Sequence, residues 1–130
     1  ADEGPHRFTY SLFPHFGAWS EGGVVDEGFR LNSPLIVTDG GAPRDAFVTL
    51  DGLPLGIGAL KRAEDGNGVV LRVYEPNGAR GSTELRFDRP FAQIHPVNIL
   101  EDVTGPAFPP GNAVTLEFRP FELRSLRLIP

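Results

Sequence analysis

Apolar and polar residues alternate along several short stretches of this chain, and turn residues separate these stretches. The alternation is clearest in residues 6–13, 82–87 and 113–118, and shorter strands are predicted at 46–50 and 57–63. Successive side chains of a β-strand point to opposite faces of a sheet, so a period of two predicts half-buried strands. Many such strands divided by Gly and Pro favour an antiparallel β-sandwich.

Three further stretches are predicted as strands. Pro34 directs Leu35–Thr38 into extended backbone, and a strand is predicted near Val97–Glu101. The last strand covers residues 121–129, where the apolar positions change parity midway. An extra residue in one strand produces such a change, so we predict a β-bulge near Arg124–Ser125.

Helix signals are scarce in this sequence. The connection over residues 14–34 is broken by Pro and Gly, and it holds one weak helical turn near Val24–Phe29. No shift of composition marks a second domain. We therefore predict an all-β fold: a single antiparallel β-sandwich domain over residues 1–130 with little or no helix.

A charged turn at Asp65–Gly68 separates two apolar stretches and predicts a hairpin. A three-residue loop places Lys61 on the face of Leu71, whereas a four-residue loop places Leu60 there, because a slip of one residue exchanges the faces. In the first register a buried Lys61 ammonium needs a carboxylate such as Glu75. A Lys61 that extends toward water at the sheet edge is favoured.

Composition excludes several classes of function. The chain has no Cys, which excludes disulfides, thiolate metal sites and Cys nucleophiles. Its net charge of −5 disfavours nucleic-acid binding, and its short apolar runs fall far below the ~20 residues that cross a bilayer. The chain also has no Met, so we expect a processed or excised piece of a larger protein. We place that protein in a bacterial cytoplasm.

No catalytic or metal-ligating cluster is predicted. The histidines His6, His15 and His95 are isolated, whereas zinc requires three or four converging ligands. Adjacent acids occur as Asp26/Glu27, Glu64/Asp65 and Glu101/Asp102. Neighbours on a strand point to opposite faces, so these pairs do not form the paired carboxylates of a glycosidase.

Aromatic side chains offer an alternative function. Sugar-binding sandwiches stack exposed aromatic rings on sugar faces, and Trp19, Tyr10 and Tyr74 are available for this. Trp19 falls in an irregular loop, where binding residues often lie. The two tyrosines fit equally well as core residues with a solvated hydroxyl.

Four motifs occur in order along nearly the whole chain. They are "FTYSLFPHFGAW" at 8–19, "LNSPL" at 31–35, "LKRAEDGNGVVLRVYEPNG" at 60–78 and "LEFRPFELRSLRL" at 116–128. Together they make the chain resemble the C-terminal β-sandwich region of glycoside hydrolase family 38, the α-mannosidases. Residues 36–56 and 88–112 match this pattern only loosely.

The resemblance implies a noncatalytic C-terminal domain of a zinc-dependent, retaining α-mannosidase. In that family the zinc ligands and the nucleophilic Asp belong to an N-terminal barrel whose motifs do not occur here, so the resemblance implies no cofactor in this chain and zinc in the missing catalytic domain. The implied partner is the remainder of the polypeptide, a catalytic barrel and helical bundle that this domain stabilises and whose substrate cleft it helps to shape. His15, Trp19 and Tyr74 are the candidates for contact with that part or with an α-mannoside. An apolar face bared by excision can make the isolated chain dimerise.

Overall fold

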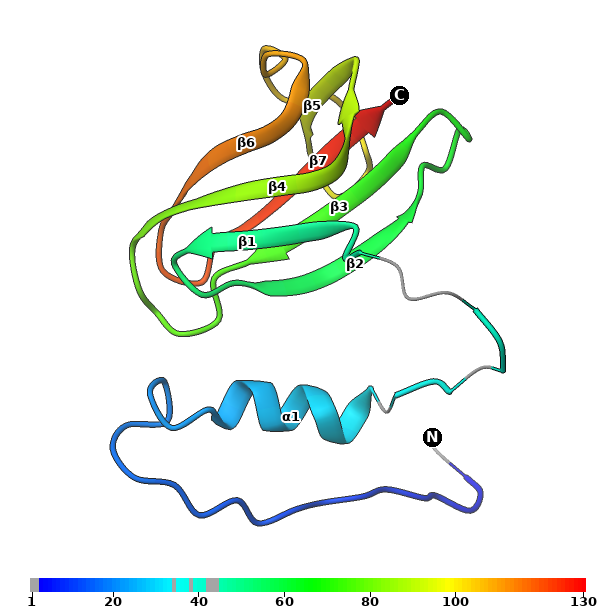
Figure 1. Ribbon diagram of the computed structural model, residues 1–130. Coiled ribbons are helices and arrows are strands. Elements are labelled where there is room, and N and C mark those ends of the chain that lie inside the picture. The colour runs from blue at the N-terminus through cyan, green and yellow to red at the C-terminus, as the bar shows by residue number, and fades with distance from the viewer. Residues whose placement is uncertain (1–2, 34, 38, 42–44) are drawn as a thin grey trace. The chain divides into compact units, whose positions relative to one another are not determined.

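The computed structural model describes residues 3–33, 35–37, 39–41 and 45–130 (Figure 1). Two compact units make up the chain, Ala1–Asp39 and Gly40–Pro130, and each is described by itself. The single-domain assignment over residues 1–130 stays a prediction.

The second unit is an antiparallel β-sandwich, which confirms the predicted fold class (Figure 1). One sheet has the order β1-β4-β6 and the other the order β2-β3-β7-β5. The strands are β1 (Val48–Gly52), β2 (Gly56–Arg62), β3 (Val69–Tyr74), β4 (Gly81–Phe91), β5 (Gln93–Val97), β6 (Gly111–Phe118) and β7 (Leu123–Ile129). The strands predicted at 46–50 and 57–63 are thus present with small shifts of their ends.

Side chains from both sheets form one hydrophobic core. On β4 the buried residues are Thr83, Leu85, Phe87 and Phe91, and on β6 they are Val114, Leu116 and Phe118. These are the faces that the period of two predicts, because only alternate residues of a sheet with one covered face are withdrawn from water. The other sheet contributes Leu71, Val73, Ile94, Leu126 and Leu128.

The hairpin between β2 and β3 has the register of the four-residue loop. Arg62 pairs with Val69 and Leu60 with Leu71, and the Ala63 N–H donates to the Gly68 carbonyl at 3.1 Å. Lys61 therefore lies on the outer face of the sheet, on the edge strand β2. Its carboxylate partner is not Glu75, as described below.

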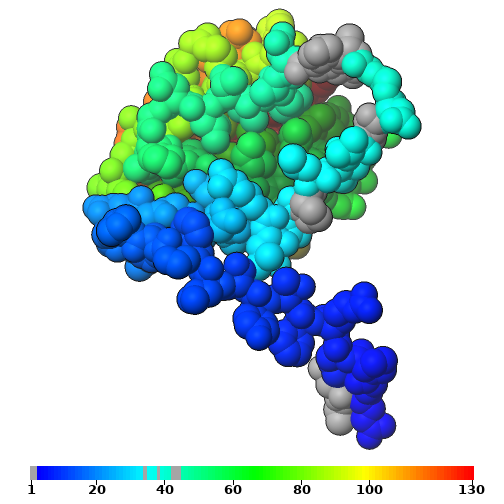
Figure 2. Space-filling model, turned by 60° about the horizontal axis from the view of Figure 1, so that its bottom comes forward, coloured from blue at the N-terminus to red at the C-terminus, as the bar shows by residue number. Residues whose placement is uncertain are grey.

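The strand predicted at residues 6–13 is not formed. The residues lie in an unpaired stretch of the first unit, seen as a thin deep-blue string in Figure 2. Phe8, Tyr10 and Leu12 expose 79%, 86% and 90% of their surface. A strand needs hydrogen-bonded neighbours for its backbone groups, and no described residue pairs with this stretch.

Other boundaries also differ from the prediction. Leu35–Val37 form no strand, while Pro34 and Thr38 lie outside the described residues. The strand predicted at Val97–Glu101 is instead β5 and ends at Val97, because the Asn98 side chain accepts hydrogen bonds from the N–H groups of residues 100 and 102 and turns the chain. Pro96 is tolerated within β5 because β5 is an edge strand.

The predicted bulge in the last strand is wrong. β7 pairs with β3 in unbroken register from Leu123 to Leu128. Arg124 takes the core-side position before Leu126, with its guanidinium 5.9 Å from the centre of the Phe118 ring. The apolar residues change from odd to even positions because Leu123 lies on the outer face of the sheet. No residue is inserted into the strand.

The first unit contains one helix, α1 (Val24–Asn32), which extends the predicted helical turn. Gly23 precedes it with a φ of 75°, a conformation that glycine adopts without steric cost. Arg30 pairs with Glu27 at 3.1 Å. Among the described residues, no helix has the length and apolar character needed to span a bilayer.

Candidate functional site

His15 has a local packing role in the first unit. Its ring stacks with Phe13 at a centroid distance of 6.3 Å. The ring also covers Gly22, where an added Cβ would lie 2.4 Å from the imidazole Nδ1. Trp19 follows in a turn and exposes 48% of its surface. The predicted contacts of both residues with sugar or with another domain stay predictions.

Tyr74 belongs to the sandwich, at the end of β3. Its ring lies on the backbone of Gly56 in β2, because a Cβ added to that glycine would be 2.5 Å from the ring carbon Cζ. The residue is half-buried. One face of the ring is therefore already in contact with protein, which leaves less of it for stacking on a sugar.

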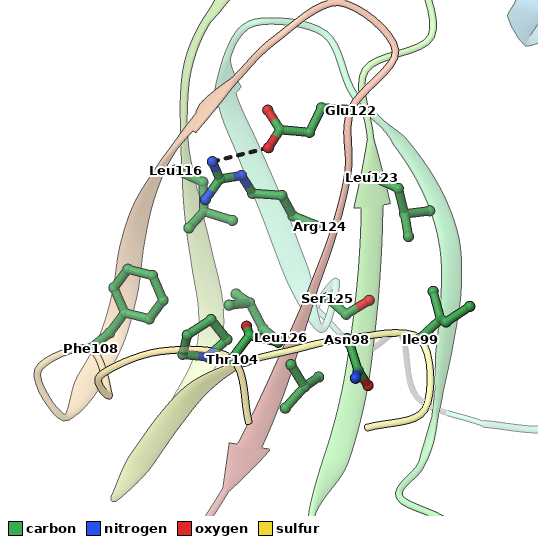
Figure 3. A pocket seen from close by; sticks show the side chains of 12 residues that line it. Asn98, Ile99, Thr104, Phe108, Leu116, Glu122, Leu123, Arg124, Ser125 and Leu126 are labelled. Carbon is green, nitrogen blue, oxygen red and sulfur yellow. Dashed lines mark ion pairs between the residues drawn. The ribbon is translucent and has the colours of Figure 1, made fainter. Parts of the chain in front are cut away.

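A pocket of about 440 Å³ opens beside the start of β7 (Figure 3). β3 pairs with β7 from Leu123 onward, whereas β5 pairs only with Ser125–Ile129. The edge of β7 that faces β5 is therefore unpaired at its first two residues. The lining residues are Pro96, Val97, Asn98, Ile99, Thr104, Phe108, Leu116, Glu122, Leu123, Arg124, Ser125 and Leu126.

Arg124 and Ser125 of this pocket do not form a nucleophile–base pair. Arg124 and Ser125 point to opposite sides of β7 (Figure 3). The Arg124 guanidinium is held by Glu122, with 3.1 Å between Nη2 and Oε1. The Ser125 Oγ is buried with no hydrogen-bond partner. A serine nucleophile requires a base within hydrogen-bond reach, and no such base is present among the described residues.

Glu75 is the most buried carboxylate of the described chain, at 1% exposure. It accepts hydrogen bonds from the backbone N–H groups of Asn77 and Gly78, both at 2.8 Å, and of Phe121, at 3.0 Å. Burial raises its pKa, but the backbone hydrogen bonds outweigh burial, so the pKa of Glu75 lies below its ordinary value. The carboxylate thus joins the turn after β3 to the turn between β6 and β7.

Glu101 fixes the loop that follows β5. It has a positive φ of 72° and is buried. Its carboxylate lies 2.8 Å from the Lys61 Nζ and accepts the Glu64 N–H at 2.8 Å. The Arg72 guanidinium donates to the Ile99 carbonyl of the same loop at 2.8 Å. These contacts hold the loop against the outer face of the four-stranded sheet.

The Lys61 ammonium and the Glu101 carboxylate stabilise each other's charged forms. The hydrogen bond from Lys61 lowers the pKa of Glu101, with a further contribution from the Glu64 N–H. The hydrogen bond to Glu101 in turn raises the pKa of Lys61, and Glu64 acts in the same direction. Lys61 therefore reaches the sheet edge as predicted, with Glu101 as its buried partner in place of Glu75.

Lys61→Met is expected to raise the pKa of Glu101 toward its ordinary value, because the replacement removes the hydrogen-bonding cation and keeps the aliphatic stem. An NMR pH titration of the Glu101 carboxyl carbon measures this change. Arg62→Met is the matched control, since its side chain is exposed and lies on the opposite face of β2. An unchanged Glu101 titration in the Lys61 variant would contradict the assigned ion pair.

The sequence did not identify Glu75 and Glu101 as organising residues. A Glu that ends an apolar strand directly before "PNG" was the available signal for Glu75. No comparable signal exists for Glu101, whose partners lie up to 40 residues away in the chain. Within the described residues no group of three or more His, Cys, Asp or Glu side chains is arranged to hold a metal ion.

Fold and sites together define an antiparallel β-sandwich domain whose two buried carboxylates fix its loops. Residues 55–126 match the model of the glycosyl hydrolases family 38 C-terminal beta sandwich domain. Since this match covers more than half of the chain, the chain belongs to that family. The resemblance carried by the four sequence motifs is thereby confirmed.

The curated relatives are α-mannosidases. Alpha-mannosidase G of Dictyostelium discoideum is 31% identical over 142 residues, covering 98% of the chain. Alpha-mannosidase 2C1 is 33% identical in Mus musculus and 30% in Homo sapiens, each covering 99% of the chain. The chain spans only 13% of the length of each relative. No solved structure gives a significant match.

Proposed function

We propose that this chain is the noncatalytic C-terminal domain of an α-mannosidase-like glycoside hydrolase. It packs against the catalytic part of the same polypeptide, stabilises it and contributes to the wall of its substrate cleft. The observation that carries the proposal is the family match combined with the length relation: the chain matches α-mannosidases over 98–99% of its length, yet it corresponds to 13% of each.

The buried carboxylates support a structural role. Glu75 is engaged by three backbone N–H groups, and Glu101 by Lys61 and the Glu64 N–H. A glycosidase acid or nucleophile must instead face the scissile bond across an open cleft. The zinc and the catalytic acids are assigned to the part of the polypeptide outside this chain.

The isolated 130-residue chain is expected to release no chromophore from a chromogenic α-mannoside, with or without added Zn²⁺. The reason is that Glu75 and Glu101, the buried carboxylates of the described residues, already interact with backbone N–H groups and with Lys61. The measurement is the rate of chromophore release, with the full-length polypeptide as the positive control. Turnover by the pure chain, lost on mutation of one of its own carboxylates, would refute the noncatalytic role.

The alternative function, an independent carbohydrate-binding module, rests on the half-exposed Trp19 indole. Titration of the chain with mannose and mannobiose separates the two functions. Under the main proposal no binding occurs up to the solubility limit. Millimolar affinity that is lost in Trp19→Ala supports the alternative.

A further inference from the structure

We infer that residues 98–102 form a hinged lid on the outer face of the four-stranded sheet, and that the Glu101 side chain is the latch that keeps this lid closed. The lid covers a buried patch of the sheet and forms one wall of the pocket beside β7. Its opening widens this pocket and brings the Ser125 hydroxyl into contact with water. The inference concerns the second unit alone and goes beyond the proposed function, on which it does not depend.

A patch of the outer face of this sheet is buried, although the patch lies away from the core. Val70, Val97 and Ser125 expose 0%, 6% and 4% of their surface. Val70 pairs with Lys61, and Ser125 pairs with Arg72 and Val97. All three buried residues therefore lie opposite the core-facing residues of their strands. Small buried clusters of this kind are typical of the surface beneath a loop.

The lid is the loop that lies over this patch. Asn98 and Ile99 of the lid line the same pocket as Ser125, and Figure 3 shows both of them beside it. The lid buries little apolar surface of its own, since Ile99 and Leu100 expose 65% and 77% of their surface. Its opening therefore loses little of the hydrophobic stabilisation that holds a core segment in place.

Hydrogen bonds inside the lid make it a compact unit. The Asn98 Oδ1 accepts the N–H groups of Leu100 and Asp102 at 2.9 and 3.0 Å, and the Asn98 N–H donates to the Asp102 carbonyl at 2.9 Å. Among the described residues, no backbone–backbone hydrogen bond joins the lid to another segment. At its base the Thr104 N–H donates to the Pro96 carbonyl at 2.9 Å. The lid can therefore rotate about this base while the hydrogen bonds of the sheet stay intact.

Side chains of the sheet hold the lid closed. The Glu101 carboxylate lies 2.8 Å from the Lys61 Nζ and accepts the Glu64 N–H at 2.8 Å. The Arg72 guanidinium donates to the Ile99 carbonyl at 2.8 Å. A segment that is held by a few such contacts opens locally, at a lower free energy than the unfolding of the whole domain. Loss of one contact should therefore increase the open fraction of the lid.

Ser125→Cys provides a reporter of lid opening, because the chain has no native Cys and the Ser125 hydroxyl has no hydrogen-bond partner among the described residues to lose. The rate at which a thiol reagent labels position 125 is measured with and without Lys61→Met, which removes the partner of Glu101. Val114→Cys reports global unfolding, since Val114 exposes 6% of its surface and belongs to the core. Arg62→Met, at an exposed position on the opposite face of β2, is the control for Lys61→Met.

Lys61→Met is expected to raise the ratio of labelling at position 125 to labelling at position 114 by roughly tenfold or more, because a hydrogen bond to a charged group stabilises the closed lid by about that factor. Arg62→Met should leave this ratio unchanged. Equal acceleration at both positions would mean that the chain unfolds as a whole. An unchanged ratio in the Lys61 variant would mean that Glu101 is not a latch, and either result would overturn the inference.

Amide hydrogen exchange tests the lid in a chain without an introduced Cys and covers reporters that fail to fold. The Glu64 N–H donates to Glu101 and has no bond to Arg72. Since the lid moves as one body, Arg72→Met, which frees the Ile99 carbonyl, is expected to speed exchange at Glu64 by roughly tenfold or more. The Ala63 amide of the same hairpin should keep its rate. Unchanged exchange at Glu64, or equal acceleration of both amides, would overturn the lid as a unit.

Discussion

Glu75→Ala is expected to lower the free energy of unfolding of the chain by about 3 kcal/mol, because it leaves three part-buried backbone N–H groups without their acceptor, and an unsatisfied buried donor costs roughly 1–3 kcal/mol. Three such groups, from Asn77, Gly78 and Phe121, donate to this carboxylate. The replacement therefore loosens two turns at once. Urea unfolding followed by far-UV circular dichroism measures the change.

Two variants make this experiment specific. Glu117→Ala removes an exposed carboxylate from β6 and is expected to change stability by less than about 0.5 kcal/mol, as surface substitutions do. Glu75→Gln keeps the size of the side chain, but its amide N–H₂ faces backbone donors, so it should also destabilise. Equal stability of the Glu75→Ala and Glu117→Ala variants would contradict the assigned role.

The contribution of Glu75 depends on pH in a defined direction. Its pKa is lower in the folded chain than in the unfolded one, so the folded state favours the ionised form. The stability that this gives is present above the unfolded pKa of roughly 4.3 and is lost as the pH falls through the folded value. The difference between the wild type and Glu75→Gln is therefore expected to be constant from neutral pH to about pH 5.5 and to shrink below pH 4.5. A difference that persists unchanged to pH 3 would show that the carboxylate charge plays no part.

Many strands of the sandwich can be predicted from the sequence, because a half-buried strand has alternating apolar and polar residues. The buried faces of β4 and β6 are predicted correctly on this basis. The turn at Asp65–Gly68 likewise predicts the hairpin, although composition alone does not choose between its two registers. That choice depends on which face the second sheet covers, and this is a property of the whole fold.

Contacts between segments that lie far apart in the chain could not be predicted from the sequence. Glu75 and Phe121 are 46 residues apart, and Glu64 and Glu101 are 37 apart. No local sequence pattern predicts either contact, because the polar groups come together only when the two sheets have packed. The same reason explains Arg124, a charged residue in a core-side position that is tolerated because Glu122 and the Phe118 ring surround its guanidinium.

Residues 6–13 have a local sequence pattern that predicts a strand, but no observed strand pairing. Their alternation predicts a strand, but these residues have no strand assignment in the structure. The alternation is a local property of the sequence, whereas a strand also needs a neighbour for its backbone hydrogen bonds. A local pattern and a tertiary contact are separate conditions, and both are needed for a strand.

Phe118→Ala is expected to produce the largest loss of stability in the sandwich, about 3–5 kcal/mol, the usual cost of removing a buried aromatic ring. Phe118 exposes 1% of its surface and belongs to the core cluster. The replacement creates a cavity and also removes the ring over which the Arg124 guanidinium lies.

The matched control is Phe121→Ala, three positions further along, in the connection between β6 and β7. Phe121 exposes 66% of its surface, with its ring against Gly78, so its removal should cost about 1 kcal/mol or less. The alternation of the sequence predicts that both phenylalanines face the core. Only the packing of the two sheets distinguishes the buried Phe118 from the exposed Phe121. Chemical unfolding of both variants at the same pH tests this difference. Equal losses would mean that the end of β6 does not insert Phe118 between the sheets, and the core described here would be wrong at that end.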